Sequence, residues 1–304
     1  MNIFITGSNG FVGGWIAKEL MKKHYVIGSG TKAASLVQVD HYIQWDISKE
    51  KIPIQFVNLK IDVIIHAAAS LDNGDNKETL IQTNCLGTYK IYTLAVQKHV
   101  KKVIYLSSIP VTGIPDAIPI KETSCMKPYT MYHATKASGE YILNQLEQIG
   151  INTIHLRIPS PIGPGMPIRS IVPIFLSQIL KGDHITLLGK GTRCQDYIDA
   201  RDIAYVIRKI VIKEIPCGIY NLASGKTISN YELAKLCIAI LHTDTEIIFS
   251  TNDDPCDDFI WDIDISKLKC VIGPFIRYSI EDSLKDIIDT MNKSFKIDKR
   301  KISI

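Results

Sequence analysis

Tyr132 and Lys136 are the residues of this chain whose types and spacing best permit acid-base chemistry. Residues four positions apart lie on the same face of a helix, so the lysine ammonium would lie beside the phenol. A nearby positive charge favours the phenolate, and we expect it to lower the pKa of Tyr132 from the ordinary value of about 10. The pair predicts a general acid and base that moves a hydroxyl proton. An exposed helix pair without chemistry is the alternative.

Ser108 is the third candidate for the reacting centre. It follows residues 103–107, an apolar run with the pattern of a buried strand. The carboxyl ends of parallel strands line the ligand crevice, so Ser108 is predicted to hold the reacting oxygen beside Tyr132. Side chains alternate along a strand, so the neighbouring Ser107 is not expected to share this role. A serine that only caps the following turn is the alternative.

A glycine-rich turn lies near the N-terminus, where an apolar strand over residues 1–6 runs into Gly7-Ser-Asn-Gly10-Phe-Val-Gly13 and then into an amphipathic helix. Glycine permits positive φ and lets the backbone approach phosphates, while the free N–H groups of the helix face the anion. This order predicts a dinucleotide pyrophosphate site, and a plain tight turn is the alternative. The residues expected to bind the cofactor here are Gly7, Asn9, Gly10, Phe11, Val12 and Gly13.

The dinucleotide turn changes the interpretation of the tyrosine and the lysine. An oxidised nicotinamide beside Tyr132 would add positive charge and lower the pKa of the phenol further. Together the motifs predict hydride transfer to or from an alcohol or ketone, with Ser108, Tyr132 and Lys136 as catalytic residues.

Strand and helix patterns alternate through the first half of the chain. This alternation predicts an α/β fold, a Rossmann-type doubly wound parallel sheet with a smaller C-terminal α/β substrate domain. Further strands are expected over residues 25–29, 41–45, 61–69, 103–107 and 151–157, and helices over 83–99 and 131–149.

The texture of the sequence changes after residue 157, because residues 158–173 contain five prolines that interrupt regular structure. We expect a dinucleotide-binding domain over 1–157, with part of 195–225 woven back into it, and a mainly substrate-binding domain over 158–292. Residues 293–304 are expected to form a basic, solvated and frayed tail.

Composition excludes several classes of function. The net charge of +4 is small, and no basic face predicts nucleic-acid binding. The seven cysteines are scattered without a Cys-x-x-Cys pair, which argues against disulfides and a metal site and for reduced thiols. Met1 leads directly into the first strand, leaving no room for a signal peptide, and no apolar run approaches the roughly 20 residues of a membrane span. A cytoplasmic protein without a membrane partner is expected.

Motifs along nearly the whole chain resemble one family. They are Thr6-Gly7-Ser-Asn-Gly10-Phe-Val-Gly13, Asp46-Ile47, His66-Ala-Ala-Ala69, Asn84-Cys-Leu-Gly87-Thr88, Ser107-Ser108, Gly113, Tyr132-His-Ala-Thr-Lys136, Gly163-Pro-Gly165 and Asp196-Tyr-Ile198. The chain resembles the extended short-chain dehydrogenases/reductases, in the nucleotide-sugar epimerase/dehydratase group. The resemblance implies that Ser108, Tyr132 and Lys136 are catalytic, and that the substrate is a nucleotide sugar. It also implies a homodimer formed through two helices of each subunit.

The same resemblance assigns further cofactor contacts. Asp46 and Ile47 would hold the adenine, and Ala67, Ala68 and Ala69 would pass under the cofactor. Many members have an acidic residue for the adenosine ribose about 20 residues past the glycine turn. This chain has Gly28-Ser-Gly30-Thr31-Lys32 there, and Thr31 or Lys32 could contact a 2′-phosphate. NAD and NADP both stay open.

The substrate side departs from the family pattern. Ser160 stands where many members have an asparagine, and Gln195 replaces an arginine that contacts the diphosphate. Arg193 would lie on the same face of an extended segment and could supply the charge; a surface arginine is the alternative. Dehydratases of the group carry an Asp-Glu pair after the catalytic hydroxyl, but here Ile109 and Pro110 follow, so dehydration is not expected.

The resulting functional prediction is an NAD(P)-dependent nucleotide-sugar 4-epimerase that works through a transient keto-sugar. An NAD(P)H-dependent keto-sugar reductase and a non-catalytic dinucleotide-sensing protein of the same fold are the alternatives. His66 is expected to be a satisfied core histidine, and His133 to point about 100° away from Tyr132 around the helix. The acidic segment 253–258 is expected to be a solvated loop and not a cation site.

Overall fold

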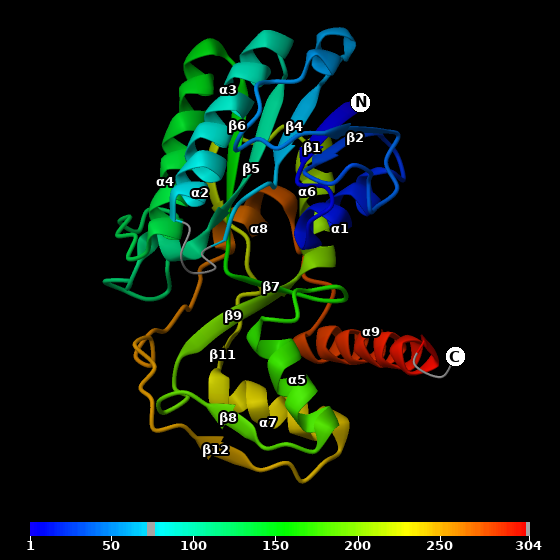
Figure 1. Cartoon of the computed structure of the whole chain (residues 1–304). Helices are drawn as coiled ribbons and strands as arrows, with labels where there is room; N and C mark the ends of the chain where they lie inside the picture. Colours follow the sequence, from blue (N-terminus) through cyan, green and yellow to red (C-terminus); the bar gives the residue numbers. More distant parts are fainter. Residues whose placement is uncertain (72–76, 302–304) are drawn as a thin grey trace.

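The computed structural model describes residues 1–71 and 77–301. Its centre is a sheet of seven parallel strands in the order β10-β6-β5-β4-β1-β2-β3 (Figure 1). This is the doubly wound arrangement that the alternating pattern predicts. The strands are β1 (Asn2–Thr6), β2 (Tyr25–Gly30), β3 (His41–Gln44), β4 (Val63–His66), β5 (Lys102–Ser108), β6 (Asn152–Ile158) and β10 (Gly218–Asn221).

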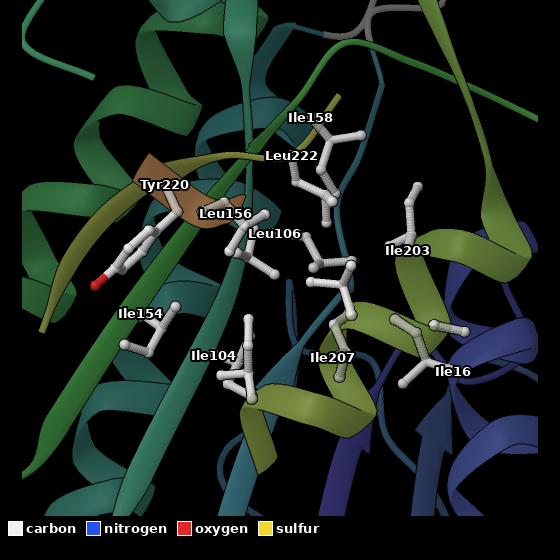
Figure 2. Packing of buried hydrophobic residues seen from close by; sticks show 14 of the residues in the cluster. Ile16, Ile104, Leu106, Ile154, Leu156, Ile158, Ile203, Ile207, Tyr220 and Leu222 are labelled. Atoms are coloured by element: carbon white, nitrogen blue, oxygen red, sulfur yellow. The ribbon is translucent and has the colours of Figure 1, made fainter. Parts of the chain in front are cut away.

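Alternation along the buried strands feeds two apolar layers. Ile3 and Ile5 of β1 face one layer, whereas Phe4 between them faces the other. Figure 2 shows the first layer, in which Ile104 and Leu106 of β5 meet Ile207 of a covering helix. The first layer is covered by α1 (Phe11–Leu20), α6 (Ala200–Ile212) and α8 (Ser266–Ile272), and the second by α3 (Gly87–Lys98) and α4 (Met131–Asn144).

A second, smaller lobe lies below the sheet in Figure 1 and has its own apolar core. Its sheets are β11-β9-β7 and β12-β8. Its strands are β7 (Ser160–Ile162), β8 (Ile185–Leu187), β9 (Cys194–Asp199), β11 (Thr227–Ser229) and β12 (Ile247–Phe249), and its helices are α5 (Ile171–Lys181), α7 (Asn230–Leu241) and α9 (Ile280–Lys301). The chain returns from this lobe through α6 to β10, which pairs with β6.

Several element boundaries differ from the predicted ones. The strand expected over 61–69 is shorter than predicted: β4 ends at His66, and Ala67 lies outside the sheet. The helix expected over 83–99 begins earlier as α2 (Lys77–Leu80) and η2 (Ile81–Leu86), a π-helix, before α3. The helix expected over 131–149 finishes as the 3₁₀ turn η4 (Gln145–Ile149) after α4. Two other 3₁₀ turns are η1 (Ile54–Asn58) and η3 (Ile109–Thr112).

The prolines after residue 157 interrupt less structure than expected. Pro173 lies in the first turn of α5, where its missing N–H has no helical partner to lose. At the other end of this lobe, α9 continues to Lys301, so most of the predicted frayed tail is helical, and 302–304 lie outside the described residues. Among the helices that the structure describes, none combines the length and the apolar character of a membrane span.

Candidate active site

A cavity of about 690 Å³ lies between the two lobes and brings the predicted motifs together. The glycine turn forms one wall, and Ser108 with Tyr132 and Lys136 forms another. Ser160, Arg193 and Gln195 close the end nearest the smaller lobe. The remaining predicted residues on its surface are Gly7, Gly10, Phe11, Val12, Gly13, Ala67 and Ala69.

The glycine turn leaves no room for side chains. Gly7 has a φ of +66°, and a Cβ there would lie 2.8 Å from the Cα of Ala68. A Cβ on Gly13 would collide with the carbonyl oxygen of Gly7, which already accepts the N–H of Gly10 at 2.9 Å. α1 then begins at Phe11 with Gly10 as its N-cap and no side-chain cap, so its first N–H groups are open to an anion. The turn therefore fits a dinucleotide pyrophosphate.

Ser107 and Ser108 have separate surroundings at the end of β5. The Ser107 hydroxyl donates to Glu140, whose carboxylate also accepts from the guanidinium of Arg157. Ser108 lies at the N-cap position of η3, yet its side chain makes no capping hydrogen bond. The turn-capping alternative is therefore wrong. The Ser108 hydroxyl lines the cavity and is available to a ligand.

Lys136 lies one helical turn beyond Tyr132 on α4, with only 3% of its surface exposed. Its Nζ lies 4.1 Å from the centre of the Tyr105 ring, a cation–π contact. Burial lowers the pKa of Lys136 to about 7, and the negative charge of Glu140 opposes this shift. The ammonium is thus held in apolar surroundings, close to its own titration point.

The pKa of Tyr132 moves in the direction opposite to the predicted one. Burial raises the pKa to about 12, because the negatively charged phenolate loses its contact with water. The predicted lowering of the Tyr132 pKa, which considered only the charge of Lys136, was wrong for the protein without a bound cofactor. Spacing placed both groups on one helix face, but it did not reveal how deeply that face is buried.

The predicted substrate residues Ser160 and Gln195 bind each other. The Ser160 hydroxyl donates to Oε1 of Gln195 at 3.0 Å. The Gln195 amide nitrogen lies 3.3 Å from the Tyr197 hydroxyl and 3.4 Å from Oδ1 of Asn230. All four side chains line the cavity, so its wall in the smaller lobe is neutral and polar at this position.

Arg193 supplies the positive charge next to this neutral wall. Its guanidinium lies 5.1 Å from the centre of the Trp261 ring, and both residues line the cavity. The Arg193 Nε is buried and has no hydrogen-bond partner among the described residues. A half-buried arginine stacked on tryptophan is not a freely solvated surface residue, so the surface alternative is wrong.

Aromatic residues that the sequence did not single out complete the cavity. Tyr129 and Trp261 line it, and the ring centres of Tyr129 and His133 lie 4.9 Å apart. His133 also lines the cavity, with its ring centre 5.3 Å from that of Tyr132. His133 follows Tyr132 directly on α4, as expected, yet both side chains line the cavity. In the sequence, only their aromatic character pointed to this role: Tyr129 follows Pro128, and Trp261 lies in the loop before α8.

His66 is the satisfied core histidine that we predicted. It is 1% exposed, and its two ring nitrogens lie 2.8 Å from the Thr6 hydroxyl and 2.9 Å from the Thr88 hydroxyl. Burial, reinforced by the charge of Lys136, lowers its pKa to about 3.

The residues predicted to hold the adenosine lie outside the described lining of the large cavity. Asn9 lines a second cavity of about 470 Å³ beside α1. Its side chain organises the loop after β2, donating to the carbonyl of Ala34 and accepting from the N–H of Leu36. The other predicted residues outside the lining are Thr31 and Lys32, both exposed, Asp46 and Ala68, both half-buried, and the buried Ile47.

The acid-base inventory of the cavity is short. Its titratable lining residues, within residues 1–71 and 77–301, are Tyr129, Tyr132, His133, Lys136, Arg193 and Tyr197, without a carboxylate. Within the same part of the chain, no group of three His, Cys, Asp or Glu side chains is placed to hold a metal ion. The arrangement can move a proton at a hydroxyl beside a dinucleotide.

A glycine turn, a Tyr-Lys pair on one helix and a strand-end serine on a doubly wound sheet define a class of dinucleotide-dependent short-chain dehydrogenase/reductase enzymes. The chain belongs to the NAD dependent epimerase/dehydratase family, whose model matches residues 3–223.

Relatives of the chain span several reactions. It is 21% identical to a dTDP-glucose 4,6-dehydratase from Streptomyces niveus, over 95% of this chain and 92% of the relative. It is 26% identical to a GDP-6-deoxy-D-talose 4-dehydrogenase from Aggregatibacter actinomycetemcomitans, over 97% and 98%. The structure of a UDP-glucose 4-epimerase from Thermotoga maritima with UDP-glucose superposes with a TM-score of 0.89, at 22% identity, over 97% of this chain and 100% of that one. The printed names of these three proteins give three different reactions.

Proposed function

We propose that the protein is an NAD(P)-dependent nucleotide-sugar 4-epimerase that works through a transient keto-sugar. The observation that carries this proposal is the single cavity that joins the glycine turn to Ser108, Tyr132 and Lys136. Gly7, Gly10 and the N-terminus of α1 would hold the pyrophosphate of a bound dinucleotide, in the same cavity that Tyr132 lines. The three catalytic residues and the cofactor contacts are part of the proposal.

Each catalytic side chain has a separate task. A bound nicotinamide supplies an acceptor and donor for a hydride. The Tyr132 oxygen takes the proton from the sugar hydroxyl and returns it after the sugar has presented its other face. The Ser108 hydroxyl donates to the same sugar oxygen in both directions. The positive charge of Lys136 would stabilise the phenolate of Tyr132.

Dehydration fits the cavity less well, although a dehydratase is among the relatives. Eliminating water requires an acid and a base beside the sugar. Ile109 is fully buried, and Pro110 is the neighbour of Ser108 that lines the cavity. No described lining residue is a carboxylate. We therefore place the reaction with epimerases and reductases.

The epimerase and the reductase differ in cofactor consumption. We would incubate the purified protein with catalytic NAD or NADP and a panel of nucleotide sugars, UDP-glucose first, and analyse the sugars by chromatography. Interconversion of 4-epimers without net NAD(P)H change supports the epimerase. Stoichiometric NAD(P)H oxidation with a keto-sugar and no epimer interconversion overturns it in favour of the reductase. The resemblance to a 4-dehydrogenase makes the reductase the second candidate.

The loop after β2 bears on whether the cofactor is NAD or NADP. No carboxylate faces the expected ribose position, and Thr31 with Lys32 is exposed there. The backbone carbonyl of Thr31 accepts a hydrogen bond from the Gln44 side chain, and that of Lys32 accepts one from the Tyr42 hydroxyl. NADP is accommodated at least as well as NAD, and the bound cofactor identified by mass in purified protein would decide between them.

A homodimer is part of the proposal. The helical layer of η2, α3, α4 and η4 exposes several large apolar side chains that a partner subunit could cover. They are Ile81, Leu86, Tyr89, Tyr141 and Ile149. Two helices from each subunit packed through this face would bury them. We place the dimer in the cytoplasm, and light scattering of the purified protein tests its mass.

A further inference from the structure

We propose that His66 is a positioning residue that holds the cofactor-binding turn and the catalytic helix in register, through a chain of hydrogen bonds that runs from Thr6 to the backbone of Asn84 and then from the Asn84 side chain to Tyr132. The proposal rests on the proposed function only in taking Tyr132 as the acid and base. Every member of the chain lies among the described residues.

The first link fixes one side of the imidazole. The Thr6 hydroxyl oxygen accepts the backbone N–H groups of Ala67 at 3.1 Å and Ala68 at 3.0 Å. A hydroxyl has two acceptor sites and one proton. Because both acceptor sites are used, the hydroxyl proton must point to His66 Nδ1, which lies 2.8 Å away. Nδ1 is therefore unprotonated.

The second link follows from the tautomer. A neutral imidazole that accepts at Nδ1 carries its proton on Nε2. His66 Nε2 lies 2.9 Å from the Thr88 hydroxyl oxygen and donates to it. The Thr88 hydroxyl in turn donates to the carbonyl oxygen of Asn84 at 2.6 Å. Burial lowers the pKa of His66 to about 3, so the ring is neutral between pH 5 and 8 and this direction holds there.

The third link reaches the catalytic helix. Asn84 lies in the π-helix η2 and is 1% exposed. Its side-chain amide pairs with both backbone groups of Ser70 and donates to the Thr135 hydroxyl at 3.0 Å. Thr135 donates to the carbonyl oxygen of Tyr132 at 2.8 Å. The chain therefore ends on the backbone of the residue that we propose as the acid and base.

The hydrogen bonds connect the His66 ring to the cofactor-binding turn at Thr6 and to the catalytic helix at Tyr132. Thr6 directly precedes Gly7, and the residues that it binds, Ala67 and Ala68, form the edge beneath the expected cofactor. A ring with its proton on Nδ1 would set a donor against the Thr6 hydroxyl and release the first link. A shift of the helix by even 1 Å relative to the cofactor would cost up to about a hundredfold in rate.

Nitrogen NMR of the His66 ring tests the tautomer without any substrate. We expect an unprotonated Nδ1 and a protonated Nε2, unchanged between pH 5 and 8, in the full-length protein labelled at histidine. A ring protonated at Nδ1 would overturn the proposal. This result is independent of whether the protein is an epimerase, a reductase or a sensor.

Matched variants test the positioning role. Thr88→Val keeps the shape and removes the hydroxyl, whereas Thr88→Ser keeps the hydroxyl. With the substrate identified by the epimer assay, we expect Thr88→Val to lower kcat about tenfold to a hundredfold, with KM nearly unchanged, and Thr88→Ser to recover most of it. Equal kcat for the two variants would contradict the proposal.

A second pair of variants tests the proposal if Thr88→Val fails to fold or if no substrate is found. Thr6→Val and Thr6→Ser differ in the same way at the cofactor end, and NADH and NADPH affinity by calorimetry is the measurement. We expect weaker binding for Thr6→Val than for Thr6→Ser by about tenfold. Equal affinities would show that the hydrogen bonds of Thr6 do not position Ala67 and Ala68 for cofactor binding.

Discussion

The guanidinium of Arg157 lies 2.8 Å from the carboxylate of Glu140, and each of the two side chains is 1% exposed. Ser107 donates to the same carboxylate, so the pair joins β5, β6 and α4 directly behind Lys136. Desolvation of the two charges is costly, and the pair is tolerable because their hydrogen bonds satisfy each other. Removing one partner strands the other charge in the core.

We expect Arg157→Met to lower the free energy of unfolding by about 3–5 kcal/mol, because it leaves Glu140 buried and unpaired. The double variant Arg157→Met/Glu140→Leu should be more stable than the single one, since no buried charge is left. Urea denaturation followed by circular dichroism measures both. Lys127→Ala is the control, because its pair with Asp116 is exposed and should leave the unfolding midpoint unchanged. A double variant less stable than Arg157→Met would contradict this account.

Tyr132→Phe tests the proposed acid and base. Loss of the phenol oxygen removes the group that moves the sugar proton, so we expect kcat to fall by about 10²–10⁴-fold. The aromatic ring stays, and the affinity for NAD or NADP should be nearly unchanged in calorimetry. Unchanged turnover, or unchanged cellular function of the variant, would instead support the dinucleotide sensor.

Arg193 lies just before β9 and Gln195 lies within it, so exchanging the two residues gives a reciprocal prediction. Arg193→Gln should weaken the binding of a nucleoside diphosphate such as UDP by about ten- to a hundredfold, because a charge-assisted hydrogen bond is worth about 1.5–3 kcal/mol. Adding Gln195→Arg should restore part of it, since both side chains line the same wall. Isothermal titration measures each affinity.

The control for this exchange is Arg169→Gln, because Arg169 is exposed and does not line the cavity. It should bind UDP like the unchanged protein. If Arg193→Gln also binds like the unchanged protein, Arg193 does not hold the anion. If Arg193→Gln loses binding and Gln195→Arg restores none of it, the neutral wall is required in its present form.

The cofactor phosphate is tested at Lys32. If its ammonium contacts a ribose 2′-phosphate, Lys32→Ala should weaken NADPH binding by about tenfold and leave NADH binding unchanged. Fluorescence titration of both reduced cofactors gives the ratio of affinities. Lys60→Ala, another exposed lysine, is the control for general charge effects. An equal change in both affinities would argue that Lys32 is only solvated.

Short-range sequence patterns predicted most of the fold and the proposed catalytic residues. The glycine turn and the Tyr-Lys spacing act within single elements, and the structure places both as predicted on one cavity. The pairing of Ser160 with Gln195 joins residues 35 positions apart, and no short-range pattern contains it. His133 is a similar case, since its place in the wall depends on loops that fold over α4.

The tertiary environment also decided the sign of the Tyr132 pKa shift. Spacing gives the direction of the electrostatic effect of Lys136, whereas burial follows from elements that are distant in the sequence. Burial dominated, and it raises the pKa of Tyr132 and lowers that of Lys136. The charge state of the pair is therefore a property of the whole site.

The lowered pKa of Lys136 makes folding stability depend on pH. The unfolded chain holds the lysine proton up to about pH 10.4, whereas the folded protein loses it near the pKa of about 7. Between these values the unfolded state binds more protons, so the contribution of Lys136 to the free energy of unfolding rises with pH, by at most about 1.4 kcal/mol per unit. Below pH 7 both states are protonated, and the cost of burying the ammonium is constant.

Lys136→Met isolates this contribution, because methionine fills a similar volume and does not titrate. We expect the difference in unfolding free energy between the unchanged protein and the variant to move in favour of the unchanged protein from pH 7 to 9. Urea denaturation at half-unit intervals measures it. Tyr132 does not interfere in this range, because its raised pKa acts only above its ordinary value near 10. Parallel pH curves would contradict this prediction, because they would mean that Lys136 keeps its proton in the folded protein up to pH 9.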